Sequence, residues 1–280
     1  MESTMRRRQS ADPGRWVVLL LLTILALATI FPFVWMASTS VKPMGDVLGA
    51  PERLLPLTYD FSTYTKIWSE VPFARYFVNS LIFSSSVVVI ALFLNSLAGY
   101  AFARLPFKGR NLLFILILCT MMIPFQVIMT PLFIIIYKLG MIDTYQGLII
   151  PKAADAFGIF MMRQFFLTLP RDLEESGRID GANEFRIYFR IMLPLCKPAF
   201  VTLGVFIFMG NWNDLLYPLL LTNSEQFRPI QAAIALFAGK YGTDYSFVMT
   251  GLLLASVPTI IAYICAQRFF VSGIAMTGIK

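Results

Sequence analysis

Six long apolar runs constrain this chain more than any other feature of its sequence. Each run holds about 18 or more residues, the length that an α-helix needs to cross the hydrocarbon core of a bilayer. The runs lie at residues 16–38, 77–103, 112–137, 146–166, 199–221 and 247–270. They predict an all-α membrane protein with six transmembrane helices.

The composition agrees with a membrane protein and narrows its chemistry. Hydrophobic residues make up 58% of the chain and charged residues 14%, whereas a soluble domain carries about 25% charge. Histidine is absent, which excludes a phosphohistidine carrier, a Ser/His triad and a His-ligated metal. The three cysteines lack the paired spacing of a zinc site. We therefore expect no catalytic residue and no metal site.

The basic residues indicate how the helices are oriented. A net charge of +7 fits topogenic charge on the cytoplasmic face of a membrane better than nucleic-acid binding. With both termini in the cytoplasm, most Lys and Arg residues fall on the inner side, as the positive-inside rule requires. The predicted segments are a cytoplasmic tail (1–15), a first transmembrane helix (16–38), an outer loop (39–75), a core transmembrane domain (76–271) and a cytoplasmic tail (272–280).

The outer and inner loops differ in character. The outer loop at 39–75 contains four prolines and is expected to be part helix and part turn. The inner segment at 167–198, called the 167–198 loop below, is rich in charge and is predicted to form two short helices joined at Gly181. Pro170 suits the first turn of the first helix, and a glycine at position 181 permits a tight turn.

The second helix of the 167–198 loop has an apolar face. Phe185, Phe189 and Met192 recur at helical spacing, and Pro194 is expected to end the helix. A helix pair this short cannot bury its own apolar face, so the membrane domain or a partner protein must cover it. A linker that lies on the membrane surface is the alternative interpretation.

The spacing of residues in this loop resembles a known family. Glu175-Ser176-Gly177, then Gly181, then Ile191 and Leu193-Pro194 match the EAA loop of permease subunits of ATP-binding cassette importers. Ser176-Gly177 stands where the family usually has two alanines, and both pairs are small. The resemblance implies that the loop docks into a cleft of an ATPase subunit. The coupling residues would then be Glu175, Ser176, Gly177, Asp180, Gly181, Ala182, Phe185, Phe189, Leu193 and Pro194.

Four further stretches are similar to the second permease of maltose, multiple-sugar and glycerol-phosphate importers. They are Asn79-Ser80, residues 160–166, residues 211–214 and residues 267–270. This likeness implies a prokaryotic inner membrane, a sugar as substrate, a second permease subunit, two ATP-binding cassette subunits and an extracytoplasmic substrate-binding protein. It also implies that ATP and Mg are bound by the cassette subunits and that this chain binds no cofactor. The chain contains no Walker-type Gly-Lys-Ser/Thr sequence.

Polar residues within the fifth apolar run are candidates for the substrate pathway. Placing a polar group in a bilayer has a high free-energy cost unless the group faces a cavity or forms a hydrogen bond with a neighbouring helix. Asn211 and Asp214 are three residues apart and share a helix face, and Trp212 has the flat ring that can stack on a sugar. Hydrogen bonding between helices and lining of the pathway both remain open. Lys152 and Asp155, three apart in the fourth run, are expected to pair with each other.

Two other classes of protein are the alternatives. An ion-coupled secondary sugar transporter would need intramembrane acids and inverted repeats, and only Asp155 and Asp214 qualify as such acids. A membrane-embedded enzyme would need a nucleophile or paired buried carboxylates, and the sequence shows neither.

Overall fold

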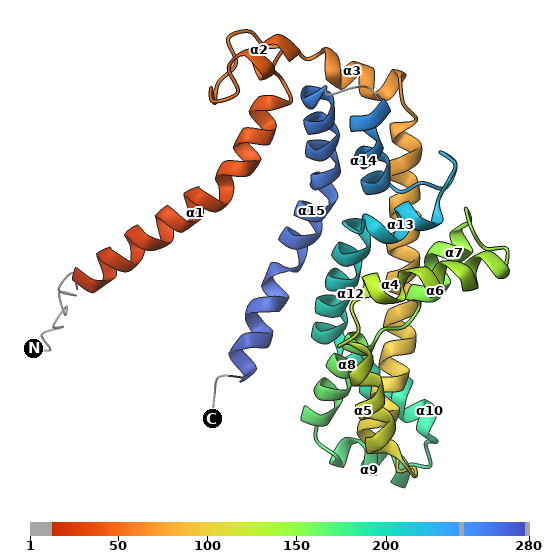
Figure 1. Cartoon of the computed structure of the whole chain (residues 1–280). Coiled ribbons are helices and arrows are strands. Elements are labelled where there is room, and N and C mark those ends of the chain that lie inside the picture. Colours follow the sequence, from red (N-terminus) through yellow and green to blue (C-terminus); the bar gives the residue numbers. More distant parts are fainter. Residues whose placement is uncertain (1–12, 241–243, 278–280) are drawn as a thin grey trace, which may run out of the picture. The chain divides into compact units, whose positions relative to one another are not determined.

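The computed structural model describes residues 13–240 and 244–277, and helices with no strands build this part of the chain. The helices form two units. One contains the described residues up to 67 together with 244–254, and the other contains the rest. Helix α15 (Tyr245–Thr277) begins in the first unit and continues into the second. Figure 1 traces the order of the helices along the chain.

The first unit holds the first apolar helix and most of the segment at residues 39–75. Its helices are α1 (Pro13–Thr39), α2 (Met44–Gly49), most of α3 (Ser62–Ser69) and the start of α15. The hydroxyl of Thr250 bonds the carbonyl of Ser40 at 3.2 Å and the hydroxyl of Thr63 at 3.0 Å. These bonds join segments far apart in the sequence. The prediction that residues 39–75 are part helix and part turn is confirmed.

The second unit contains the helices that position the candidate sites. In chain order they are α4 (Phe73–Arg104), α5 (Arg110–Thr120), α6 (Phe125–Lys138), α7 (Tyr145–Ile149), the 3-10 turn η1 (Ile150–Lys152), α8 (Ala156–Thr168), α9 (Asp172–Ile179), α10 (Glu184–Ile187), the π-helical turn η2 (Tyr188–Met192), α11 (Leu193–Leu195), α12 (Lys197–Trp212), α13 (Leu216–Leu221) and α14 (Ile230–Lys240). Helices α8 and α12 both pack against α4 (Figure 1).

The structure confirms an all-α membrane protein but not the count of six spans. In the described part of the chain, three helices are long and apolar enough to cross a membrane, and bent pairs raise the number to at most five. The third predicted helix is broken between α5 and α6 with a bend of 98°. Pro124 lies at this break, and proline interrupts a helix because it has no backbone N–H and its ring clashes with the preceding turn. The fourth shrinks to α8, whose 13 residues span only about 20 Å.

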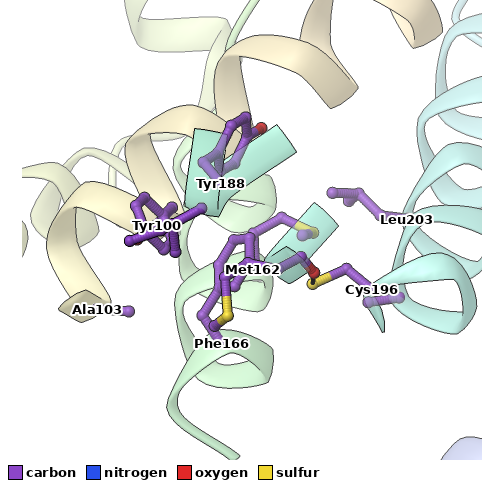
Figure 2. Packing of buried hydrophobic residues seen from close by; sticks show 10 residues of the cluster. Tyr100, Ala103, Met162, Phe166, Tyr188, Cys196 and Leu203 are labelled. Atoms are coloured by element: carbon purple, nitrogen blue, oxygen red, sulfur yellow. Dashed lines mark hydrogen bonds between the residues drawn. The ribbon is translucent and has the colours of Figure 1, made fainter. Parts of the chain in front are cut away.

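A buried aromatic cluster holds the 167–198 loop to the membrane helices. Tyr100 of α4, Phe166 of α8 and Tyr188 of η2 have ring centroids within 6.4 Å of one another. Figure 2 shows these rings with Met162 and Cys196 in the same cluster. The loop is therefore anchored by side chains from α4 and α8, and its second half is part of the core.

Close approach of α4 and α8 depends on a glycine. A Cβ atom on Gly99 would lie 2.7 Å from the Cβ of Met162 and 2.9 Å from the backbone nitrogen of Arg163. Both distances are shorter than van der Waals contact, and backbone cannot yield by a rotamer change. Small residues let membrane helices come this close.

Gly99→Ala is expected to destabilise the protein by about 1–3 kcal/mol, the usual effect of overpacking. Thermal unfolding of the purified protein in detergent measures the change. Gly210→Ala is the matched control, because a Cβ at Gly210 of α12 meets nothing within 4 Å. Equal stability of the two variants would contradict the close packing of α4 against α8.

Candidate functional site

The first half of the 167–198 loop ends in a closed turn at Gly181. The amide of Ala182 bonds the carbonyl of Gly177 at 2.9 Å, and the amide of Gly181 bonds the carbonyl of Arg178 at 3.0 Å. This pair of bonds is the Schellman motif that ends many helices. Gly181 has φ +76°, the left-handed conformation that favours glycine. The predicted junction at Gly181 is confirmed.

The next helix is capped as soon as the turn is complete. The side chain of Asn183 accepts a hydrogen bond from the amide of Arg186 at 2.9 Å, the N-cap arrangement that satisfies a free backbone donor. Gly177 lies against the side chains of Ile187 and Ile191, and a Cβ there would come within 2.9 Å of Ile191. The two helices of the loop therefore pack on each other through a small residue.

A buried ion pair fastens α9 to the end of α4. The Arg104 guanidinium lies 3.4 Å from the Glu174 carboxylate, and the two side chains are 4% and 5% exposed. Arg104 also donates to the carbonyls of Phe166 and Leu169, both at 2.5 Å. Burial raises the pKa of Glu174, and the nearby Arg104 charge opposes that rise. No local signal in the sequence pairs these two residues, because they are distant along the chain.

A second, more exposed ion pair links the two helices of the loop. The Arg178 guanidinium lies 2.8 Å from the Glu184 carboxylate, and the Tyr100 hydroxyl donates to the same carboxylate at 3.2 Å. The hydrogen bond from Arg178 lowers the pKa of Glu184, although partial burial acts in the opposite direction. These contacts fix the angle between α9 and α10 without any contribution from a partner protein.

The predicted apolar face of the second helix is corrected by the structure. Phe185 and Phe189 are exposed, but Met192 is fully buried in the aromatic cluster. The reason is the π-helical turn η2, whose wider i to i+5 spacing places Met192 on the same face as Ile187. Pro194 does not end the helix, which continues through α11 to Leu195.

Three exposed apolar residues of α9, α10 and η2 are the candidate docking surface, namely Ile179, Phe185 and Phe189. Their exposed fractions are 86%, 69% and 45%. Ile179 was missed by the sequence analysis, and its position four residues after Glu175 was the available signal. Of the predicted coupling residues, the structure places Glu175, Ser176, Asp180, Gly181, Phe185, Phe189 and Pro194 at the surface, Ala182 and Leu193 half-buried, and Gly177 buried.

Lys152 and Asp155, which are neighbours in the fourth apolar run, have different polar partners in the structure. Asp214 forms an ion pair with Lys152 and accepts a hydrogen bond from the amide of Tyr217 at 3.2 Å. The predicted pair of Lys152 with Asp155 is therefore wrong. Asp155 instead caps α8 and bonds Asn95 of α4 at 2.7 Å, because the break before α8 turns its carboxylate toward the helix N-terminus and α4.

Trp212 does not offer its ring to a sugar. It is 1% exposed, its ring packs edge to face with Phe77 and stacks on Phe208 at centroid distances of 5.3 and 5.6 Å, and its indole nitrogen donates to the carbonyl of Ala255 at 2.9 Å. The structure therefore does not place Trp212 for stacking on a sugar, because helix packing buries the ring. Asn211 lies beside a cavity described below.

No group of three or more Cys, Asp or Glu side chains within residues 13–240 and 244–277 has the arrangement of a metal site. The functional features of the described residues are the anchored loop, its exposed apolar surface and a cavity lined by apolar and a few polar side chains.

The profile of one protein family matches residues 95–275 of the chain, which include the whole 167–198 loop. The family is described as the binding-protein-dependent transport system inner membrane component. The chain belongs to this family and is the multi-pass permease subunit of an ATP-binding cassette importer.

Individual relatives agree over nearly the full length. The arabinooligosaccharides transport system permease protein of Bacillus subtilis is 35% identical over 95% of this chain and 96% of its own length. The lactose transport system permease protein of Rhizobium radiobacter is 31% identical over 98% of each chain. The trehalose/maltose transport system permease protein of Thermococcus litoralis is 32% identical over 92% of this chain and 94% of its own.

A solved structure has the same fold. It belongs to a bacterial ABC transporter involved in the import of the acidic polysaccharide alginate, with a TM-score of 0.81 and 27% identity, and the match covers 94% of this chain and 98% of that chain. The resemblance to the permease family, inferred above from the spacing of the loop residues, is confirmed by the family match.

Proposed function

We propose that this chain and a second permease together form the path for a sugar, in an importer driven by two ATP-binding cassette subunits. The names of the relatives support a saccharide as substrate, because they specify arabinooligosaccharides, lactose and trehalose or maltose. A substrate-binding protein would deliver the sugar on the outer side. ATP and Mg would be bound by the cassette subunits, and this chain would not hydrolyse ATP.

The observation that carries this proposal is the 167–198 loop. Its framework is held from within by the Arg104–Glu174 and Arg178–Glu184 pairs, while Ile179, Phe185 and Phe189 stay exposed. An apolar helix face presented on a rigid support is a typical feature of helix-in-groove recognition. We infer that this face docks into a cleft of the cassette subunit on the cytoplasmic side, with both chain termini on that side.

The coupling follows from the same anchoring. Because Arg104 and the aromatic cluster connect the loop to α4 and α8, a displacement of the docked loop would move these helices with it. Closure of the two cassettes on ATP would pull the two loops together and tilt the attached helices. Access to the pathway would then switch from the inner to the outer side.

Purification of the tagged chain, expressed with the other genes of its operon, tests the assembly. Co-purification of a second permease and an ATPase, with saccharide uptake in proteoliposomes, is the expected result. A chain that transports sugar alone would contradict the proposal and would favour an ion-coupled transporter.

Glu175→Lys and Gly181→Asp are expected to lower ATP-driven uptake about tenfold, because either change alters the docking side of the loop and loss of one charge-assisted contact has this size. Uptake is measured per assembled complex. Arg190→Ala is the control, since Arg190 is exposed on the same loop outside the proposed coupling residues. Normal uptake by both variants would contradict a coupling role for these positions.

A further inference from the structure

A cavity of about 380 Å³ opens where η1 and α8 face α12. Its walls include Lys152, Asp155, Phe157, Phe206, Gly210 and Asn211. The volume falls in the range of about 300–1,000 Å³ that is typical of small-molecule sites. None of these residues belongs to the 167–198 loop, so ATPase coupling does not account for the cavity.

One wall carries a polar atom that lacks a partner. Asn211 is 8% exposed, and its amide nitrogen donates to the carbonyl of Ile207 at 2.7 Å. Its amide oxygen is buried and accepts no hydrogen bond from any residue that the structure describes. Leaving such an acceptor unpaired in a buried position is unfavourable. Asn χ2 is broadly distributed, so a small rotation of the amide would let a hydroxyl in the cavity supply the missing donor.

Two aromatic rings form an apolar part of the cavity wall. Phe157 and Phe206 meet edge to face with centroids 6.2 Å apart, and both are partly exposed. Flat apolar rings beside a small number of polar groups are the usual lining of a ligand site. This combination matches a saccharide, which has apolar C–H faces and hydroxyl edges.

The charges around the cavity favour a neutral ligand. Lys152 is held by Asp214 and lies 4.7 Å from the centre of the Tyr217 ring. Both oxygens of Asp155 already accept hydrogen bonds, from Asn95 and from the amide of Gly158. An anionic sugar would meet the Asp155 carboxylate and the Lys152 ammonium group, which is already paired with Asp214. Its charge would therefore find no free cation among the lining residues that the structure describes.

We propose that this cavity is a saccharide subsite on this permease and that it accepts a neutral sugar unit rather than a uronate. Asn211 would bond a sugar hydroxyl, Phe157 and Phe206 would contact its C–H face, and the Lys152–Asp214 pair would keep the cavity without net positive charge. This inference rests on the proposed function, since it specifies the class of sugar that the importer carries.

Protection of an introduced thiol tests the subsite in the complete importer in lipid nanodiscs. Gly210→Cys places a thiol in the cavity wall, where a side chain has room. The exposed Cys119 and Cys265 are first replaced with serine, and the buried Cys196 is retained. Lactose, maltotriose and arabinotriose are expected to slow labelling of Gly210→Cys by a charged thiosulfonate several-fold. An alginate trisaccharide at the same concentration is expected to have no effect.

Two variants serve as controls. Asn213→Cys lies on an exposed position after the same helix and should label at one rate with or without sugar. Adding Asn211→Leu to Gly210→Cys should remove the protection. If Gly210→Cys impairs uptake, Ala154→Cys on the facing wall is used instead.

Three results would overturn the subsite. The first is an unchanged labelling rate with every neutral sugar in an importer that still transports one of them. The second is that the introduced thiols cannot be labelled because a partner subunit fills the cavity. The third is that the uronate protects the thiol as well as the neutral sugars do. An importer that assembles but carries no saccharide would instead contradict the proposed function, so the two failures are distinguishable.

Discussion

Replacing Arg104 with alanine is expected to lower the free energy of unfolding by about 3–5 kcal/mol, because it leaves the buried Glu174 carboxylate without its counter-charge. The same change removes the donor to the carbonyls of Phe166 and Leu169 at the end of α8. The 167–198 loop should then detach from α4. Thermal unfolding in detergent and the yield of assembled complex measure the effect.

The control for this prediction is Arg190→Ala, which removes an exposed arginine from the same loop and should change stability by less than about 0.5 kcal/mol. The double variant Arg104→Met with Glu174→Leu should recover part of the loss, because a buried ion pair can be replaced by apolar residues with little effect. Equal stabilities of Arg104→Ala and Arg190→Ala would show that the ion pair does not anchor the loop.

The second large effect is expected at the docking surface. Ile179→Asp combined with Phe185→Asp should abolish association with the ATPase, since charged groups would replace the two most exposed apolar side chains of this surface. Loss of a single interface hot spot weakens binding by about 2–4 kcal/mol. Co-purification of the ATPase with the tagged chain measures association, and uptake in proteoliposomes measures the consequence.

The folded state should survive these two substitutions, because neither side chain belongs to the buried cluster of the loop. Leu57→Asp is the matched control, since Leu57 has the same 69% exposure as Phe185 but lies in the segment at residues 39–75, outside the proposed docking surface. Retention of the ATPase by the double variant, or its loss in Leu57→Asp, would contradict docking through Ile179 and Phe185.

Features with a local signal could be predicted from the sequence. The apolar runs predicted a membrane protein, and the spacing from Glu175 to Pro194 predicted the family and the helix pair joined at Gly181. Breaks within the apolar runs were harder to predict. The bend at Pro124 has a local cause, whereas the shortening of the fourth helix to α8 depends on Asp155, which caps that helix and bonds Asn95 on α4.

Long-range pairings could not be predicted, because sequence spacing contains no information about which distant side chains meet. Helical spacing favours Asp155, three residues away, as the partner of Lys152. In the folded chain Lys152 instead pairs with Asp214, which is distant in the sequence. Trp212 has a flat ring of the kind that stacks on sugars, but packing against Phe77 and Phe208 buries it.

Hydrophobicity and the fixed spacing of the 167–198 loop determine the class of protein and the position of the proposed coupling segment, because both are properties of short stretches of chain. Only the tertiary structure decides which residues of that segment are available. The π-helical turn places Met192 in the core, and Ile179, Phe185 and Phe189 stay exposed on the folded loop. Tertiary packing also creates the cavity at Asn211, whose walls come from segments that meet only when the chain folds.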